Sequence, residues 1–161
     1  MALQPGRIAR LLAAGLAGSL AHTALMALKS WAGWLPDFQP YQDVQAMLGA
    51  LIGRSVHPLV PWVLSYFNGA VVLGFAFGRL YPWLPGRNGV AKGGVFGLGV
   101  WCVMGLLFFP AIGKGLFAAG TLHGLVPTLF TLAMVLAYAL VLGGAYALLF
   151  PRADRVAERQ P

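Results

Sequence analysis

The chain alternates between four long apolar segments and shorter stretches that hold its basic, polar and turn-forming residues. The apolar segments cover residues 8–28, 59–80, 93–109 and 126–150. A helix rises 1.5 Å per residue, so about 20 residues cross a hydrocarbon core of roughly 30 Å. The third segment is short, and it reaches this length only if Lys92 snorkels to the interface. The pattern predicts four transmembrane helices.

Two of the connections have patterns of their own. Residues 81–88 are few and rich in turn formers, which predicts that spans two and three form an antiparallel hairpin. Residues 42–53 carry apolar side chains three and four positions apart, which predicts a short amphipathic helix on the outer surface between spans one and two. We interpret this helix as a cap over the ends of the bundle.

The connection at 110–127 is unusually apolar for a loop. A break near His123, Gly124 and Pro127 would produce a short interfacial or re-entrant segment before span four. Non-helical backbone at membrane depth needs protein or trapped water to satisfy its polar groups. This connection is therefore a place where a binding site could lie.

The composition supports a membrane protein. Hydrophobic residues make up 59% of the 161 residues and charged residues only 9%, whereas soluble domains carry about 25% charged residues. The sequence therefore predicts a single transmembrane domain over residues 1–161. Its expected fold is all-α, an antiparallel four-helix transmembrane bundle with the short amphipathic outer helix. A single cysteine, Cys102, excludes an intramolecular disulfide.

The distribution of basic residues predicts the orientation. On the side of the chain termini lie Arg7, Arg10, Arg79, Arg87, Lys92, Arg152, Arg155 and Arg159, and on the other side lie Lys29, Arg54 and Lys114. The positive-inside rule then places both termini in the cytoplasm of a multi-pass protein in the bacterial inner (plasma) membrane. The net charge of +7 fits a cytoplasmic face that meets anionic lipids, and nucleic acid is not an expected partner.

The first segment also has features of a secretory signal peptide, with residues 24–27 as a poor cleavage region. The length of the segment and the lack of an A-x-A site favour a retained helix, and cleavage stays open as the alternative.

The acidic residues argue against two classes of function. All four lie outside the predicted spans, at Asp37, Asp43, Asp154 and Glu158. Proton-coupled transporters usually need a carboxylate inside the membrane. The sequence also lacks a G-x-S-x-G elbow and an H-E-x-x-H metal helix. We therefore expect no enzymatic activity and no cofactor.

Three histidines have the widest chemical range of the remaining residues. His22, His57 and His123 are all predicted in the outer half. Neutral imidazole ligates divalent metals and haem b, so a metal site at His57 and His123 stays open as an alternative. No pair has a diagnostic spacing, and a lone interfacial histidine usually makes only a hydrogen bond.

Polar residues within the spans could meet inside the bundle. By depth, His22 can approach Ser65, Asn68 and Thr131. The simpler interpretation is a polar contact that holds helices together. The functional alternative is a ligand site made by His22, Ser65, Asn68 and His123.

Small residues predict where helices pack closely. In span one they form the face of His22, with Gly15, Gly18 and Ser19, and in span three they are Gly93 and Gly97. We interpret both sets as helix-packing surfaces.

The sequence resembles an uncharacterised family of small four-helix bacterial membrane proteins. The resembling pieces are GLAGSLAHTALMALK (15–29), QDVQAMLG (42–49), NG (68–69), LPG (84–86), KGGVFG (92–97) and PAIGKGLF (110–117). Members of that family often carry a histidine beside the Phe-x-Gly step of span two, and this chain has none there. The resemblance implies the topology and no activity.

These patterns favour an accessory, assembly or oligomeric structural subunit, with other membrane subunits or further copies of itself as partners. The first alternative is an outer-side haem, metal or lipophilic-ligand binding protein that uses His22, His57 or His123. The second alternative is a small-solute transporter.

Overall fold

The computed structural model describes residues 5–120 and 124–150, which form helices and loops with no strand in this part of the chain. The helical stretches long and apolar enough to cross a membrane, among the described residues, are Pro5–Trp31, Leu59–Leu80, Gly89–Ala111 and Val126–Leu149. The prediction of an all-helical fold with four membrane-length helices is therefore confirmed. His123 and the basic and acidic residues of the C-terminal tail lie outside the described residues.

The first half of the chain forms two membrane-length helices with a short helix between them. α1 (Pro5–Trp31) is the first span, and α2 (Pro40–Ile52) is the short helix predicted at 42–53. The second span runs without a break through α3 (Leu59–Phe67), the π-helix η1 (Asn68–Leu73) and α4 (Gly74–Leu80).

The second half repeats this plan with a different connection. The third span consists of α5 (Gly89–Val103), the π-helix η2 (Met104–Phe108) and α6 (Phe109–Ala111). A 3₁₀ turn, η3 (Leu116–Ala118), follows it, and α7 (Val126–Leu149) is the fourth span. Where an interfacial segment was predicted, the described part of the connection therefore holds only this short turn.

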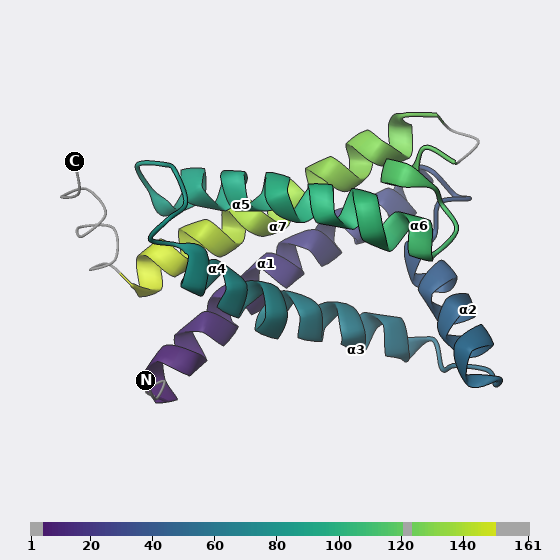
Figure 1. The fold of residues 1–161 in the computed structure, drawn as a ribbon, viewed down its shortest axis with the longest axis horizontal. Helices are drawn as coiled ribbons and strands as arrows, with labels where there is room; N and C mark the ends of the chain where they lie inside the picture. Colours follow the sequence, from purple (N-terminus) through teal and green to yellow (C-terminus); the bar gives the residue numbers. More distant parts are fainter. Residues whose placement is uncertain (1–4, 121–123, 151–161) are drawn as a thin grey trace.

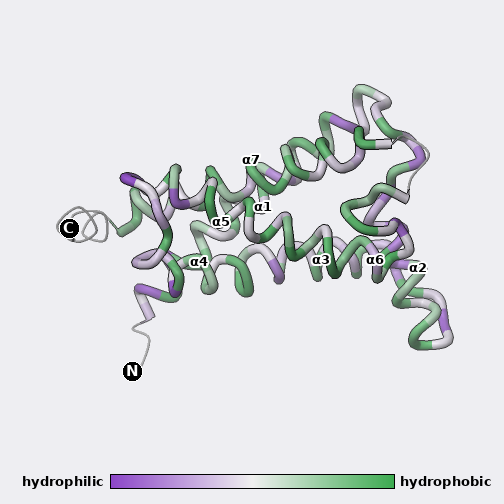
Figure 2. Tube along the Cα trace, turned by 45° about the horizontal axis from the view of Figure 1, so that its top comes forward, coloured by the Kyte–Doolittle hydropathy of each residue, from purple (hydrophilic) through white to green (hydrophobic). Residues whose placement is uncertain are grey.

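The bundle has two distinct ends (Figure 1). The start of α1, the end of α7 and the α4–α5 loop lie together at one end, here called the terminal end, and α2 lies at the other, here called the α2 end. Apolar residues follow the helices, and hydrophilic residues concentrate toward these ends (Figure 2). This distribution is what a membrane-spanning bundle requires, because lipid is the solvent along its middle.

α7 is the central helix of the bundle and packs along both α5 and α1. Glycines allow the approach: a Cβ on Gly93 would strike the carbonyl of Ala139, and a Cβ on Gly143 would strike the carbonyl of Gly89. On the other side, a Cβ on Gly18 would come within 2.8 Å of the Tyr138 ring. The helices are therefore closer than any larger residue would permit.

An aromatic cluster fills the bundle toward the terminal end. Phe77 makes edge-on contacts with Tyr81 and Tyr146, at ring-centre distances of 5.4 Å in each case. Lys92 is buried against this cluster, where its Nζ donates to the Tyr81 carbonyl at 2.9 Å and lies 4.5 Å from the ring centre. With 2% of its surface exposed, Lys92 is buried, and a carbonyl and an aromatic face solvate its ammonium group inside the protein.

The two π-helices coincide with buried glycines. In η1, a Cβ on Gly69 would strike the Ser19 side chain, and the Tyr138 hydroxyl donates to the Gly69 carbonyl at 2.7 Å. In η2, a Cβ on Gly105 would strike the Phe117 ring. A π-turn shifts the register of the backbone carbonyls, and here one of those carbonyls receives a hydrogen bond from another span. No pattern in the sequence predicted either π-helix.

Candidate functional site

The first and second spans diverge toward the α2 end. α1 packs against η1 and α4, and it makes little contact with α3. The space that opens between α1 and α3 is covered by the start of α2. A pocket of about 370 Å³ lies there, and we call it the α2 pocket. It is lined by Thr23, Met26, Ala27 and Ser30 of α1, by Gln39, Tyr41 and Gln42 at the start of α2, and by Trp62 of α3.

Two hydrogen bonds between side chains join the helices around the α2 pocket. The hydroxyls of Tyr41 and Ser65 are 3.0 Å apart, which ties α2 to α3. The hydroxyls of Thr23 and Tyr66 are 2.9 Å apart, which ties α1 to α3. The pocket walls are therefore held by bonds between three different elements.

An aromatic pair forms one wall of the pocket. The rings of Tyr41 and Trp62 stack with their centres 4.3 Å apart and their planes at 27°. Burial raises the pKa of the Tyr41 phenol above its ordinary value, and this effect outweighs that of the hydrogen bond with Ser65, which lowers the pKa. Tyr41 is therefore a neutral hydrogen-bonding group at physiological pH.

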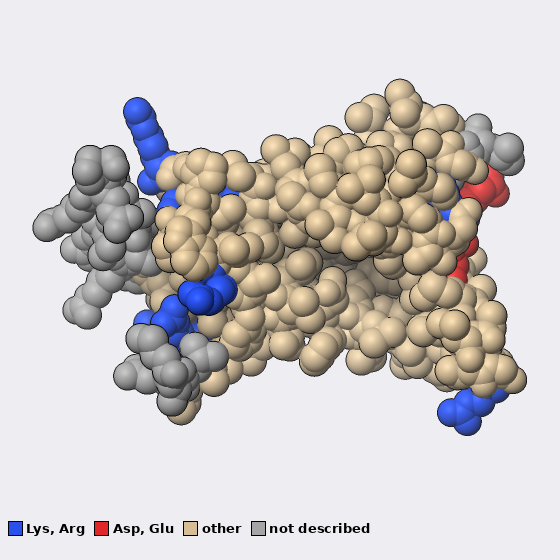
Figure 3. Space-filling view, viewed as in Figure 1, with Lys and Arg blue, Asp and Glu red and all other residues tan. Residues whose placement is uncertain are grey.

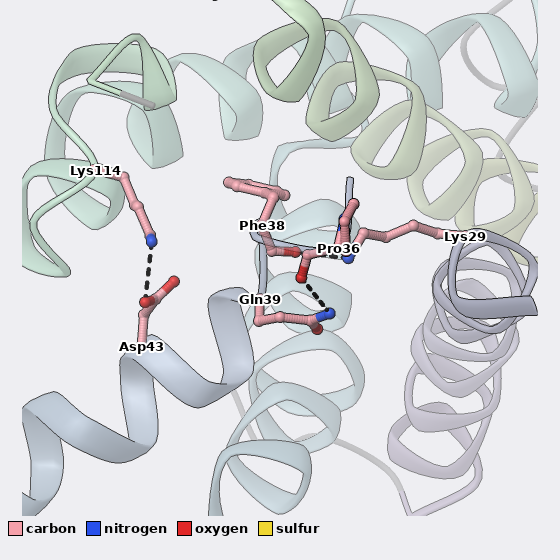
Figure 4. Close-up of polar contacts among 6 residues, drawn as sticks. All are labelled: Lys29, Pro36, Phe38, Gln39, Asp43 and Lys114. Atoms are coloured by element: carbon pink, nitrogen blue, oxygen red, sulfur yellow. Dashed lines mark hydrogen bonds and ion pairs between the residues drawn. The ribbon is translucent and has the colours of Figure 1, made fainter. Parts of the chain in front are cut away.

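Three contacts hold the loop before α2 and α2 itself in place (Figure 4). Lys29, only 1% exposed, donates from Nζ to the Phe38 carbonyl at 2.6 Å. Gln39 donates from Nε2 to the Pro36 carbonyl at 3.0 Å. The ion pair between Lys114 and Asp43, with 3.1 Å between Nζ and Oδ1, attaches α2 to the connection after the third span.

Several polar groups of the α2 pocket remain available for a ligand. Among the described residues, no hydrogen-bond partner occurs for the side chains of Ser30 and Gln42 or for the Oε1 atom of Gln39. No ionised side chain lines the pocket. The lining thus offers donors and acceptors, an aromatic wall and the apolar side chains of Met26 and Ala27, without a charge.

Among the described residues, no hydrogen bond joins the predicted site residues to one another, and His123 lies outside this part of the chain. Ser65 bonds to Tyr41 beside the α2 pocket, while the Thr131 hydroxyl donates to the Thr128 carbonyl within α7 at 2.9 Å. His22 is half-buried, and the described residues give it no hydrogen bond. Asn68 is exposed on the surface of the second span.

The histidine predicted as a metal ligand lies in a second, more open groove between α2 and α3. This groove, of about 380 Å³, is lined by Leu48, Ile52, Arg54, Ser55, Val56, His57, Val60 and Leu64. The Nδ1 atom of His57 accepts a hydrogen bond from the Leu59 backbone N–H at 3.2 Å, so this nitrogen caps α3. Within residues 5–120 and 124–150, no three residues among His, Cys, Asp and Glu are grouped so that they could hold a metal ion.

The predicted packing residues of the first span lie at helix contacts. A Cβ on Gly15 would meet the Cα and carbonyl oxygen of Ala70 at 2.7 Å. The Ser19 hydroxyl donates to the Gly15 carbonyl at 3.0 Å and lies against Gly69. In the third span, Gly97 contacts the Cβ of Ala139.

The charged side chains lie at the two ends (Figure 3). Lys and Arg side chains gather at the terminal end, whereas the α2 end shows both basic and acidic side chains in this view. The exposed basic residues described at the terminal end are Arg7, Arg10, Arg79 and Arg87.

The comparison with protein families assigns the chain. The model of a family of unknown function, DUF6789, matches residues 6–156. The chain belongs to this family. The expected membership in an uncharacterised family is thereby confirmed. The description of the family assigns no activity to its members. No curated protein and no solved structure matches it.

Sequence reasoning missed the pocket residues Tyr41, Gln42 and Trp62. Trp62 fits the aromatic belt expected at a membrane interface, a pattern that also occurs in proteins without a pocket. Tyr41 and Gln42 begin the amphipathic helix, and their position over α1 and α3 depends on contacts that the sequence pattern does not encode.

Proposed function

We propose that the protein is a non-enzymatic membrane protein that binds a lipophilic molecule with an uncharged, hydrogen-bonding headgroup in the α2 pocket. The observation that carries this proposal is the lining: a stacked aromatic pair beside unbonded groups of Ser30, Gln39 and Gln42, without an ionised side chain. Ligand sites commonly combine such walls with a few polar groups in volumes of about 300–1,000 Å³.

The absence of charge in the lining selects among headgroups. An anionic or cationic headgroup would gain no counter-charge from the residues that line the pocket. An uncharged headgroup with hydroxyl or carbonyl groups can exchange water for Ser30, Gln39 and Gln42. The stacked rings of Tyr41 and Trp62 favour an apolar or planar part next to that headgroup.

Quenching of Trp62 fluorescence tests the proposal. The probes are dibrominated monostearoylglycerol, which is uncharged, and dibrominated phosphatidylglycerol, which is anionic, each added to detergent-solubilised protein. We expect saturable quenching by the uncharged probe, and we expect Trp62→Phe to lose that component while the other tryptophans keep their signal.

A double variant measures the polar contacts. Combining Ser30→Ala with Gln42→Ala should weaken binding of the uncharged probe about tenfold, because each lost hydrogen bond contributes roughly 0.5–1.5 kcal/mol. Ser55→Ala, in the second groove that contains His57, is the matched control and should bind normally. Equal quenching by both probes, or unchanged affinity of the double variant, would refute the proposal.

We also propose that the protein resides in the bacterial inner membrane with the terminal end in the cytoplasm. The basic side chains gathered at that end support this orientation. The α2 pocket would then open on the outer side. Fusion of fluorescent protein and of alkaline phosphatase to residue 161 tests it: fluorescence without phosphatase activity is expected, and the reverse would overturn the orientation.

A second candidate function is that of an accessory or assembly subunit. The exposed amide of Asn68, near the middle of the second span, favours it, because a polar side chain at this depth gains a partner when spans associate.

A further inference from the structure

The amide of Asn68 is the most unusual group on the surface of the second span. It lies nine residues after the start of Leu59–Leu80, about 14 Å along a helix of roughly 33 Å. Its side chain is exposed, and the described residues provide it with no hydrogen bond. An amide in this position faces hydrocarbon with two donors and a carbonyl acceptor unsatisfied.

The surroundings of Asn68 are apolar. Leu64 and Val72, four residues before and after Asn68, are 46% and 50% exposed, and the adjacent Phe67 is 57% exposed. The charged side chains visible in the space-filling view lie at the ends of the bundle (Figure 3). The surface is therefore an apolar helix face with one amide near its centre, which is the composition of membrane helix interfaces joined by a polar side chain.

We infer that this face, which we call the Asn68 face (Leu64, Phe67, Asn68 and Val72), binds a second copy of the chain through paired Asn68 amides. This gives the second candidate function a partner and a surface, and it rests on that candidate rather than on the α2 pocket. The argument for a second copy is complementarity. An amide is both donor and acceptor, so two Asn68 side chains related by a two-fold axis satisfy each other.

The membrane strengthens the argument for self-association. Copies of one chain insert with one orientation, so their Asn68 residues share the same depth. A two-fold axis along the membrane normal brings residues of equal depth together. Any other partner would need its own polar group at this level.

Cysteine cross-linking in native membranes tests the inference. In a Cys102→Ser background, Leu64→Cys places a thiol one turn from Asn68 on the Asn68 face. Leu129→Cys, on α7 and 62% exposed, is the control. Oxidation should produce disulfide-linked dimers with Leu64→Cys and few with Leu129→Cys. Equal cross-linking of the two would overturn the inference.

Substitution of the amide measures its contribution. Asn68→Leu should weaken dimerisation in detergent about threefold to thirtyfold, the range that interhelical polar contacts show, and Asn68→Gln should restore most of it. Because Asn68 is exposed, Asn68→Leu should remain folded, and the cross-linking arm does not depend on it. Dimerisation unchanged by Asn68→Leu would contradict the inference.

Two failures are distinguishable. If Leu64→Cys forms no cross-linked dimer, but Asn68→Leu dissociates a larger complex observed by native mass spectrometry, the partner is another protein. In that case only the inference of self-association fails. If neither change has an effect, the subunit candidate fails as well. Binding of the uncharged probe to the α2 pocket is independent of both results.

Discussion

The contact between Gly15 and the second span offers the sharpest test of how this bundle is held together. In Gly15→Ala, the new Cβ would lie 2.7 Å from the Cα and carbonyl oxygen of Ala70 and 2.8 Å from the carbonyl oxygen of Gly69. Ordinary contacts of a Cβ begin at about 3.4 Å, and all three atoms belong to backbone. The spans must therefore separate by more than half an ångström, since no side chain can rotate away.

The expected cost follows from overpacking. Extra methyl groups in a well-packed interior usually cost about 1–3 kcal/mol, while alanine favours a helix over glycine by up to about 1 kcal/mol. We expect Gly15→Ala to lower the free energy of unfolding by about 1–2 kcal/mol after this gain. Separation of α1 from η1 would also displace Ser19, whose side chain lies against Gly69.

Unfolding by titration with sodium dodecyl sulfate, followed by circular dichroism, measures this difference in mixed micelles. The matched control is Gly99→Ala, because a Cβ at Gly99 meets no atom within 4 Å and should be neutral or stabilising. If Gly15→Ala unfolds at the same free energy as Gly99→Ala, the close approach of the first two spans is refuted. If both variants are destabilised equally, the effect does not come from this contact.

Three further predictions concern single polar contacts. Tyr138→Phe leaves the Gly69 carbonyl without its 2.7 Å hydrogen bond and should lower the free energy of unfolding by about 1–2 kcal/mol. No change in the sodium dodecyl sulfate titration would show that water replaces the hydroxyl. Lys114→Met removes the partly exposed ion pair with Asp43 and should lower the free energy of unfolding by less than about 1 kcal/mol. It should nevertheless speed amide hydrogen exchange in α2. Exchange at wild-type rates would count against a role of this ion pair in holding α2. Burial raises the pKa of Tyr41, so the unfolded chain loses this phenolic proton at a lower pH than the folded chain does. The free energy of unfolding should therefore fall as the pH rises above about 10. Tyr41→Phe should show a smaller fall than the parent protein, and identical pH profiles would refute this assignment.

The spans were predictable because their length and hydropathy are imposed by the bilayer. The third is the informative difference, since it was predicted at 93–109 and extends over Gly89–Ala111. Its earlier start has a local cause: the Asn88 side chain accepts a hydrogen bond from the Ala91 N–H at 2.8 Å and caps the helix. Gly89 then lies against Gly143, so the extra turn is also packed.

The candidate site was much less predictable than the spans. Depth along the helix predicts which polar residues share a level, but it does not predict which side of the helix faces a neighbour. Ser65 and Asn68 are three residues apart, and the structure gives one a partner in α2 and leaves the other exposed. The π-helix that begins at Asn68 adds to this difficulty, because it changes the angular step on which face assignments depend.

The positions of the glycines explain why a pocket forms at one end of the bundle. Gly15, Gly69 and Gly74 lie where α1 meets η1 and α4, so the first two spans touch backbone to backbone there. Helices that cross this closely at one level must separate beyond it. Toward the α2 end the gap between α1 and α3 is wide enough for the rings of Tyr66 and Trp62. There the hydrogen bond of Tyr66 with Thr23 and the stacking of Trp62 on Tyr41 replace direct helix packing. Close packing by small residues at one level therefore creates the space for large polar aromatics at the next, and the start of α2 covers part of that space while Ser30 and Gln42 stay exposed.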